Sequence, residues 1–296
     1  MKDLSVVLGP MRLKNPLVAV SGTFGYGYDY EDILPPEAFG AITLKGTSPE
    51  PWAGNKPPRL VETPSGMLNS IGLQNPGVQQ LCETHLPRLQ KTDVCVIVNV
   101  VGRTIADYQT VAEKITDAGG ADALELNISC PNVKAGGMSF GVDPQQAAKL
   151  TAAVDEVTHL PLVVKLTPNV TDIAEIACAV EDAGADVISL INTLQGMEID
   201  VEREEPTLGA VFGGLSGPAI RPVALRCIWQ VYEAVDIPVL GMGGVSSARD
   251  VLAFMMAGAD AIGIGTSLFS RPTGIFKILD NLRDSCYDDW PVGRAH

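Results

Sequence analysis

Eight short apolar runs recur along the chain, and each ends in Gly, Asn, Ser, Thr or Lys. In order they are LVAVSG (17–22), AITLKG (41–46), VIVNVVG (96–102), LELNIS (124–129), LVVKLT (162–167), VISLINT (187–193), PVLGMGG (238–244) and AIGIGT (261–266). Runs that are apolar on both faces and separated by helix-length segments are typical of parallel strands buried under helices. Eight such units predict an α/β protein with a closed (β/α)8 TIM barrel better than an open sheet.

The segments between the runs support helices. Six of them carry apolar residues at three- and four-residue spacing, and several open with a Ser, Thr or Asp cap; they are residues 104–118, 143–158, 171–183, 217–234, 246–257 and 272–286. Three similar sequence segments, DAGGADALEL, DAGADVISL and MAGADAIGI, join a helix to the next strand. Gly ends the helix there and Ala-Asp leads into the strand, so we interpret these segments as structural helix–strand turns rather than as a binding motif.

Three stretches lie outside the minimal barrel. Residues 4–16, LSVVLGPMRLKNP, predict a small N-terminal β-hairpin that closes the barrel floor. Residues 47–77 and 195–216 form long uncoiled connections after the second and sixth strands. Such connections are usually lids or partner surfaces, and the sequence does not indicate which of the two would cover a substrate. We expect residues 1–296 to form one domain.

Charge and composition exclude several classes of function. The formal net charge of −14 argues against nucleic acid and anionic membranes, both of which require clustered Lys or Arg. The N-terminus has no apolar signal-peptide region and the chain has no apolar stretch of about 18 residues, so we expect a cytoplasmic protein. No CxxC pair occurs and only three histidines are present, which makes a zinc or iron–sulfur site in this chain improbable. The six cysteines are Cys82, Cys95, Cys130, Cys178, Cys227 and Cys286.

Polar residues and glycines stand at the predicted strand ends, where barrels of this kind place their active sites. They are Ser21, Lys45, Asn99, Asn127 with Cys130, Lys165, Asn192 with Thr193, Gly243 with Gly244, and Gly265 with Thr266. One such residue could simply tie down a loop. Two lysines and three asparagines together are costly to bury without partners and predict a binding site.

The last two strand ends carry a more specific signal. Gly243-Gly244 precede a helix that we expect Ser246 to cap, and Gly265-Thr266 precede a short turn. Barrels commonly bind phosphate with the loops after strands seven and eight, where backbone N–H groups can approach the anion. The neighbouring amides and lysines suit flavin mononucleotide (FMN), with Lys165 facing the flavin pyrimidine edge. The same residues would also suit a sugar phosphate.

Five motifs, in the same order along nearly the whole chain, resemble one known family. SGTFGYG, ITLKGT, NSIGLQNPG, NISCPNVKAGGMSFG and GMGGV are similar to the class 1B catalytic subunit of dihydroorotate dehydrogenase. The resemblance implies an FMN-containing barrel that oxidises (S)-dihydroorotate to orotate in de novo pyrimidine biosynthesis.

The resemblance also implies roles for individual residues. Cys130 would be the base that removes the C5 proton, while C6 passes a hydride to flavin N5. Substrate would contact Lys45, Asn69, Ser70, Ile71, Gly72, Leu73, Asn127, Asn192 and Thr193. FMN would contact Ser21, Lys45, Gly46, Asn99, Asn127, Lys165, Ile191, Gly217, Gly243, Gly244, Gly265 and Thr266.

Class 1B membership implies a partner subunit. That subunit would carry FAD and a [2Fe–2S] cluster and pass electrons from FMN to NAD⁺, within a heterotetramer built around a homodimer of this chain. SGTFGYG and NVKAGGMSFG differ from the fumarate-using class 1A pattern, and the chain lacks the N-terminal extension and catalytic serine of class 2. The alternatives are a fumarate-dependent class 1A-type enzyme, a non-redox phosphate-binding lyase or isomerase, and a non-catalytic flavoprotein subunit.

Overall fold

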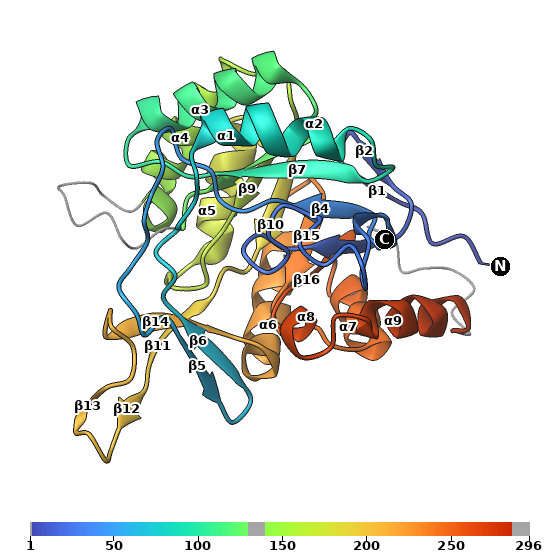
Figure 1. The fold of residues 1–296 in the computed structure, drawn as a ribbon. Helices are drawn as coiled ribbons and strands as arrows, with labels where there is room; N and C mark the ends of the chain where they lie inside the picture. The colour runs from blue at the N-terminus through green and yellow to red at the C-terminus, as the bar shows by residue number, and fades with distance from the viewer. Residues whose placement is uncertain (1, 130–139, 286–296) are drawn as a thin grey trace.

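A closed barrel of eight parallel strands organises the molecule (Figure 1). The computed structural model describes residues 2–129 and 140–285. Each predicted run overlaps one barrel strand, and each strand pairs with the next in chain order until the last pairs with the first. The TIM-barrel prediction is therefore confirmed. The strands are β3 (Leu17–Ala19), β4 (Ala41–Thr43), β7 (Cys95–Val100), β8 (Ala123–Asn127), β9 (Leu162–Lys165), β10 (Val187–Leu190), β15 (Val239–Met242) and β16 (Ala261–Ile264).

The helices surround this barrel. The six predicted segments contain α3 (Ile105–Ala118), α4 (Pro144–Asp155), α5 (Ile173–Asp182), α6 (Arg221–Tyr232, after the 3₁₀ turn η4, Pro218–Ile220), α7 (Ala248–Met256) and α9 (Gly274–Arg283). The short α8 (Ser267–Ser270) follows β16, and the 3₁₀ turn η3 (Phe140–Val142) precedes α4. None of the described helices is long and apolar enough to cross a membrane.

Two connections depart from the simple βα repeat. After β3, residues 20–40 form only the 3₁₀ turn η1 (Pro36–Ala38) and no α-helix, because glycines and Pro35-Pro36 interrupt the segment. After β4, an unpredicted helical stretch runs through α1 (Val78–Gln80), the π-helical turn η2 (Leu81–His85) and α2 (Leu86–Leu89). Pro87 within this stretch hides its helical pattern.

The three similar helix-to-strand segments have a common structural role. Helices α3, α5 and α7 end within two residues of their glycines, as predicted. In each segment the Asp carboxylate accepts the backbone N–H of a residue that opens the preceding strand, while the Asp N–H donates to the carbonyl of that same residue. These paired bonds lock each helix–strand turn to the barrel rim. The pairs are Asp122 with Val96, Asp186 with Leu162 and Asp260 with Val239.

The N-terminal hairpin is present as predicted. Strands β1 (Val6–Leu8) and β2 (Met11–Leu13) pair antiparallel, and Leu8 and Leu13 are fully buried. The turn at Gly9 lies against Val187, the first residue of β10. The hairpin therefore packs against the N-terminal ends of the strands, which form the floor of the barrel.

The two long connections are not uncoiled, so that prediction was wrong. The first contains β5 (Leu60–Thr63) and β6 (Gly66–Asn69), and the second contains β11 (Leu194–Met197) and β14 (Phe212–Ser216). These strands form one four-stranded antiparallel sheet in the order β11-β14-β6-β5, with Gly214 opposite Asn69. Glycines in β6, β11 and β14 weaken their strand pattern, and the central pair, β6 with β14, joins connections that are far apart in sequence.

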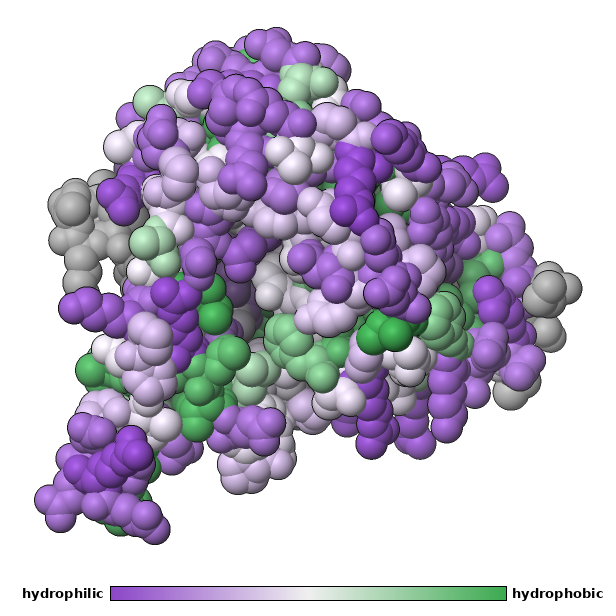
Figure 2. All heavy atoms as spheres, viewed as in Figure 1, coloured by the Kyte–Doolittle hydropathy of each residue, from purple (hydrophilic) through white to green (hydrophobic). Residues whose placement is uncertain are grey.

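The four-stranded sheet presents an apolar surface. Leu60, Met197 and Phe212 on it are exposed, and Figure 2 shows hydrophobic atoms gathered over its strands. Beyond it, β12 (Ile199–Asp200) and β13 (Glu205–Pro206) pair as a small hairpin, which projects from the body and is mostly hydrophilic (Figures 1 and 2).

Candidate active site

A buried carboxylate lies at the centre of the barrel interior. Glu125 and Asn127 are two residues apart on β8 and therefore face the same side of the strand. Glu125 is only 1% exposed. Its Oε2 accepts a hydrogen bond from Asn99 Nδ2 at 2.6 Å and lies 3.4 Å from Lys165 Nζ. Its Oε1 accepts from the Ser189 hydroxyl at 2.9 Å. This carboxylate joins strands β7, β9 and β10.

The three predicted asparagines form one chain of side-chain contacts. Asn127 Nδ2 lies 3.4 Å from Asn99 Oδ1, and Asn192 Nδ2 lies 3.5 Å from Asn127 Oδ1. Asn192 Oδ1 accepts the backbone N–H of Thr193 at 2.8 Å. The structure thus brings together residues from β7, β8, β9 and the segment after β10: Asn99, Asn127, Lys165, Asn192 and Thr193.

Lys45 and the NSIGL segment flank this chain. Lys45 is partly buried; burial first, and repulsion from Arg59 second, lower the pKa of its ammonium, against the opposing effect of Asp29. A Cβ atom at Gly46 would lie 2.9 Å from Asn99 Oδ1 and 3.8 Å from Leu73 Cδ2. Glycine at position 46 therefore allows the backbone after β4 to touch Asn99.

The segment from Asn69 to Leu73 reaches the site through the four-stranded sheet. Asn69 Nδ2 donates to the carbonyl oxygen of Gly214 at 3.2 Å, and Gly214 itself packs against the Thr193 side chain. Asn55 donates its backbone N–H to Ile71, packs beside Gly72 and donates its side-chain amide to the Ser70 carbonyl. The hydroxyl of Ser70 is buried and has no hydrogen-bond partner among the described residues.

The predicted phosphate-binding residues converge in the same way. A Cβ atom at Gly244, whose φ is +80°, would lie 2.6 Å from the Gly217 carbonyl oxygen, so a side chain there would collide with the backbone before α6. Gly243 packs against Ile191. Thr266 Oγ1 donates to Ser216 Oγ at 2.8 Å, beside Gly217. On the other side, Gly265 packs against Val20, the residue before Ser21.

The helix after the glycine pair is capped by a different serine than predicted. The side chain of Ser247 accepts from the Asp250 N–H, so Ser247 rather than Ser246 caps α7. Ser246 donates its backbone N–H and its hydroxyl to the Asp250 carboxylate instead. Burial acts to raise the pKa of Asp250, but hydrogen bonds from Ser247 and Ser246 together with Arg221 lower it overall. Because the two serines are adjacent and identical in type, the sequence does not indicate which of them caps the helix.

The predicted base, Cys130, lies outside the described residues, as does Cys286. The other four cysteines have free thiols whose pKa burial raises, to about 12 for Cys95. Thiols of this kind are poor nucleophiles and bases near neutral pH. Among the described residues, no three His, Cys, Asp or Glu side chains form a group that could hold a metal ion.

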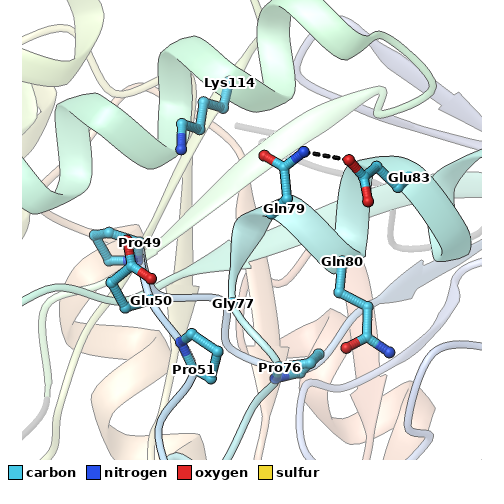
Figure 3. A pocket seen from close by; sticks show the side chains of 9 residues that line it. All are labelled: Pro49, Glu50, Pro51, Pro76, Gly77, Gln79, Gln80, Glu83 and Lys114. Atoms are coloured by element: carbon cyan, nitrogen blue, oxygen red, sulfur yellow. Dashed lines mark hydrogen bonds between the residues drawn. The ribbon is translucent and has the colours of Figure 1, made fainter.

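A cavity of about 560 Å³ lies elsewhere on the molecule (Figure 3). The Lys114 side chain extends from α3 toward Pro49 and Glu50, and Gln79 is hydrogen-bonded to Glu83 on the facing helical stretch. Of the predicted site residues that the structure describes, none lines this cavity, which is therefore distinct from the polar cluster around Glu125. Its lining consists of Pro49, Glu50, Pro51, Pro76, Gly77, Gln79, Gln80, Glu83 and Lys114.

Sequence reasoning missed three residues that organise the site. Glu125 and Ser189 bond to each other inside the barrel, and the Tyr108 hydroxyl donates to the Asn127 carbonyl oxygen at 2.7 Å. Glu125 offered a signal, because it is a charged residue two positions before Asn127 inside an otherwise apolar strand. Ser189 and Tyr108 carry no comparable signal.

Comparison with known proteins shows which family the chain belongs to. Residues 4–285 match the family model described as dihydroorotate dehydrogenase. Three relatives are each named dihydroorotate dehydrogenase B (NAD⁺), catalytic subunit. The relative from Desulforamulus reducens is 54% identical over 95% of this chain and 92% of its own length. Those from Parabacteroides distasonis and Alkaliphilus oremlandii are 51% and 50% identical, over 97% and 96% of this chain and 94% and 93% of theirs. The chain belongs to the dihydroorotate dehydrogenase family.

Proposed function

We propose that this chain uses FMN to oxidise (S)-dihydroorotate to orotate in de novo pyrimidine biosynthesis, and that the electrons reach NAD⁺ through a partner subunit. The names of the relatives support the reaction and its acceptor. The observation that carries the proposal is the convergence of Lys165, Asn99, Asn127 and Asn192 in one polar group inside the barrel.

The described residues fit FMN. Gly217, Gly243 and Gly244 all have positive φ values and pack so closely against neighbouring atoms that a Cβ would collide, and Thr266 lies beside Gly217. Closely packed glycine turns of this kind suit a phosphate held by backbone N–H groups. Lys165 and Asn99 supply a buried cation and an amide for the pyrimidine edge of the flavin. Gly46, Gly265, Ser21 and Ile191 complete this set in the proposal.

The substrate residues fit a flat ring that carries carbonyl, N–H and carboxylate groups. The amides of Asn69, Asn127 and Asn192 can each donate and accept hydrogen bonds. Lys45 supplies an ammonium for the carboxylate. Ser70, with its unpartnered buried hydroxyl, offers a further polar group beside them.

Oxidation requires the loss of a proton from C5 and of a hydride from C6. Bound FMN supplies the hydride acceptor at N5. In this proposal the Cys130 thiolate removes the C5 proton. A free thiol has a pKa of about 8.5, so the thiolate fraction, and with it the rate, rises with pH in the neutral range.

The proposal includes a wider assembly. Residues 1–296 act as one FMN-binding domain in the cytoplasm, and two copies form a homodimer within a heterotetramer. The partner subunit carries FAD and [2Fe–2S]. The exposed Leu60, Met197 and Phe212 on the four-stranded sheet support a protein contact at that surface, since large apolar patches commonly mark interfaces.

One anaerobic titration tests the reaction. We expect the purified protein to be yellow and to bleach when dihydroorotate is added. A colourless protein that binds sugar phosphates would instead indicate a lyase or isomerase, and a yellow protein that does not bleach would indicate a non-catalytic flavoprotein. Reoxidation of the bleached protein by NAD⁺ only in the presence of the partner subunit supports the proposed acceptor, whereas reoxidation of the isolated chain by fumarate contradicts it.

A further inference from the structure

The asparagine contacts in the candidate active site run in a single direction. Asn99 donates to Glu125, Asn127 points its amide nitrogen at Asn99, and Asn192 points its amide nitrogen at Asn127. At the far end, the Thr193 backbone N–H donates to Asn192. Every amide therefore presents its nitrogen toward Glu125 and its oxygen toward Thr193.

Both ends of this series impose the same direction. An ionised carboxylate only accepts hydrogen bonds, and a backbone N–H only donates. If the Asn99 amide were turned round, its oxygen would face the Glu125 carboxylate, and two acceptors would be left opposed in a buried site. The same reversal at Asn127 or Asn192 would oppose two oxygens on one side and two N–H donors on the other.

Glu125 is itself held in place. The Ser189 hydroxyl occupies Oε1 at 2.9 Å, which leaves Oε2 for Asn99 and Lys165. The nearby Lys165 ammonium compensates the buried charge, because an isolated carboxylate would be costly at this depth.

We propose that Glu125 is a positioning residue that sets the orientation of the Asn99, Asn127 and Asn192 amides and of the Lys165 ammonium. This inference rests on the proposed function, because these four side chains are the ones expected to meet flavin and substrate. Each amide uses one N–H and one oxygen lone pair for hydrogen bonds within the series. Its second N–H and second lone pair remain available to ligands. The direction imposed by Glu125 decides where those remaining donors and acceptors point.

The test is calorimetric titration of orotate into the oxidised, FMN-loaded protein. Glu125→Gln preserves size but can present either an oxygen or an amino group to Asn99, so both amide directions become accessible. We expect its dissociation constant for orotate to rise roughly tenfold or more, as loss of a hydrogen bond to a charged group would produce. A folded, FMN-loaded Glu125→Gln protein that binds orotate as tightly as the wild type would overturn the proposal.

A compensating variant separates orientation from packing. In Glu125→Gln with Asn99→Asp, the acceptor-only group moves one position along the series, and Asn127 must again point its nitrogen toward it. We expect this double variant to recover at least half of the lost affinity on a logarithmic scale. If Glu125→Gln does not fold, the double variant is the test, because it retains one carboxylate in the cluster. Measurable orotate binding by its FMN-loaded form supports the proposal, and loss of orotate binding by that FMN-loaded form refutes it.

The matched control is Thr151→Val, which removes a fully buried hydroxyl from α4, outside the site. We expect it to lower the melting temperature without changing the affinity for orotate. If affinity falls equally in this control, Glu125 acts only through general stability and the proposal fails. A wild-type protein that binds neither FMN nor orotate would instead refute the proposed function, so the two failures are distinguishable.

Discussion

The ammonium of Lys165 and the carboxylate of Glu125 lie 3.4 Å apart inside the barrel, and their side chains are only 7% and 1% exposed. Neither charge can turn to solvent when its partner is removed. Removing one member of a buried ion pair typically costs about 3–5 kcal/mol, because the other charge stays uncompensated.

Lys165→Ala should therefore affect both stability and the flavin. We expect the free energy of unfolding, measured with urea on the FMN-free protein, to fall by about 3–5 kcal/mol. FMN should bind more weakly or have a lower reduction potential, because a nearby cation stabilises the charge that reduction creates. Lys165→Met combined with Glu125→Gln is the control that removes both charges, and it should recover stability but not flavin affinity. Unchanged flavin content and potential in Lys165→Ala would contradict the role of the ammonium.

Cys130→Ala should leave the protein yellow but nearly inactive. We expect anaerobic flavin reduction by dihydroorotate to slow by about 10²- to 10⁴-fold, the usual contribution of a general base. Stopped-flow absorbance of the flavin measures this rate directly. Cys178→Ala, which alters a thiol on α5, is the matched control and should be reduced at the normal rate. A normal rate in Cys130→Ala would rule out this thiol as the base.

Orotate affinity should depend on the protonation of Lys45. Burial and the neighbouring Arg59 lower the pKa of Lys45 below the ordinary value of about 10.4. Since only the ammonium attracts a carboxylate, affinity should be full below the lowered pKa and decline as pH rises through it. Titrations of orotate at increasing pH measure this decline. Lys45→Gln should bind weakly at every pH, and persistence of the decline in that variant would assign it to another group.

Asp250 should contribute to the stability of the protein against acid. Its pKa is lowered in the folded protein, so its contribution is full above the unfolded value of about 3.9 and is lost as pH falls through the folded value. Asp250→Asn should therefore be less stable than the wild type at neutral pH, and the difference should shrink at about pH 3. Urea unfolding at both pH values measures this difference. Asp280→Asn, on an exposed pair with Arg283, is the control and should change little.

Gly214→Ala should impair substrate binding without loss of FMN. A Cβ atom at position 214 would lie 2.1 Å from Thr193 Oγ1, so Thr193 must move. We expect a higher KM for dihydroorotate and normal flavin content. Gly274→Ala, where the nearest atom would lie 3.4 Å away, is the control and should behave as wild type. An unchanged KM in Gly214→Ala would show that the position of Thr193 does not limit binding.

The barrel was predictable because each of its strands has a recognisable local sequence pattern. Runs such as LVVKLT combine an apolar strand with a polar residue where the strand ends, and Lys165 is the last residue of β9, as predicted. The strands around Asn69 and Gly214 were not predictable. Their apolar pattern is weak, and each pairs both within its own connection and with a strand from the other connection, which the sequence does not place beside it. Glu125 was missed because its function depends on Ser189 and Lys165, which the sequence does not place beside it.

The pairing of β6 with β14 changes what the two long connections can do. As separate segments either could cover the substrate, yet hydrogen bonds between β6 and β14 join the two connections in one four-stranded sheet. Neither connection can swing outward alone without breaking that pairing. Any opening of the site on this side must therefore be a hinged displacement of the whole sheet, and it would carry Asn69 and Gly214 together.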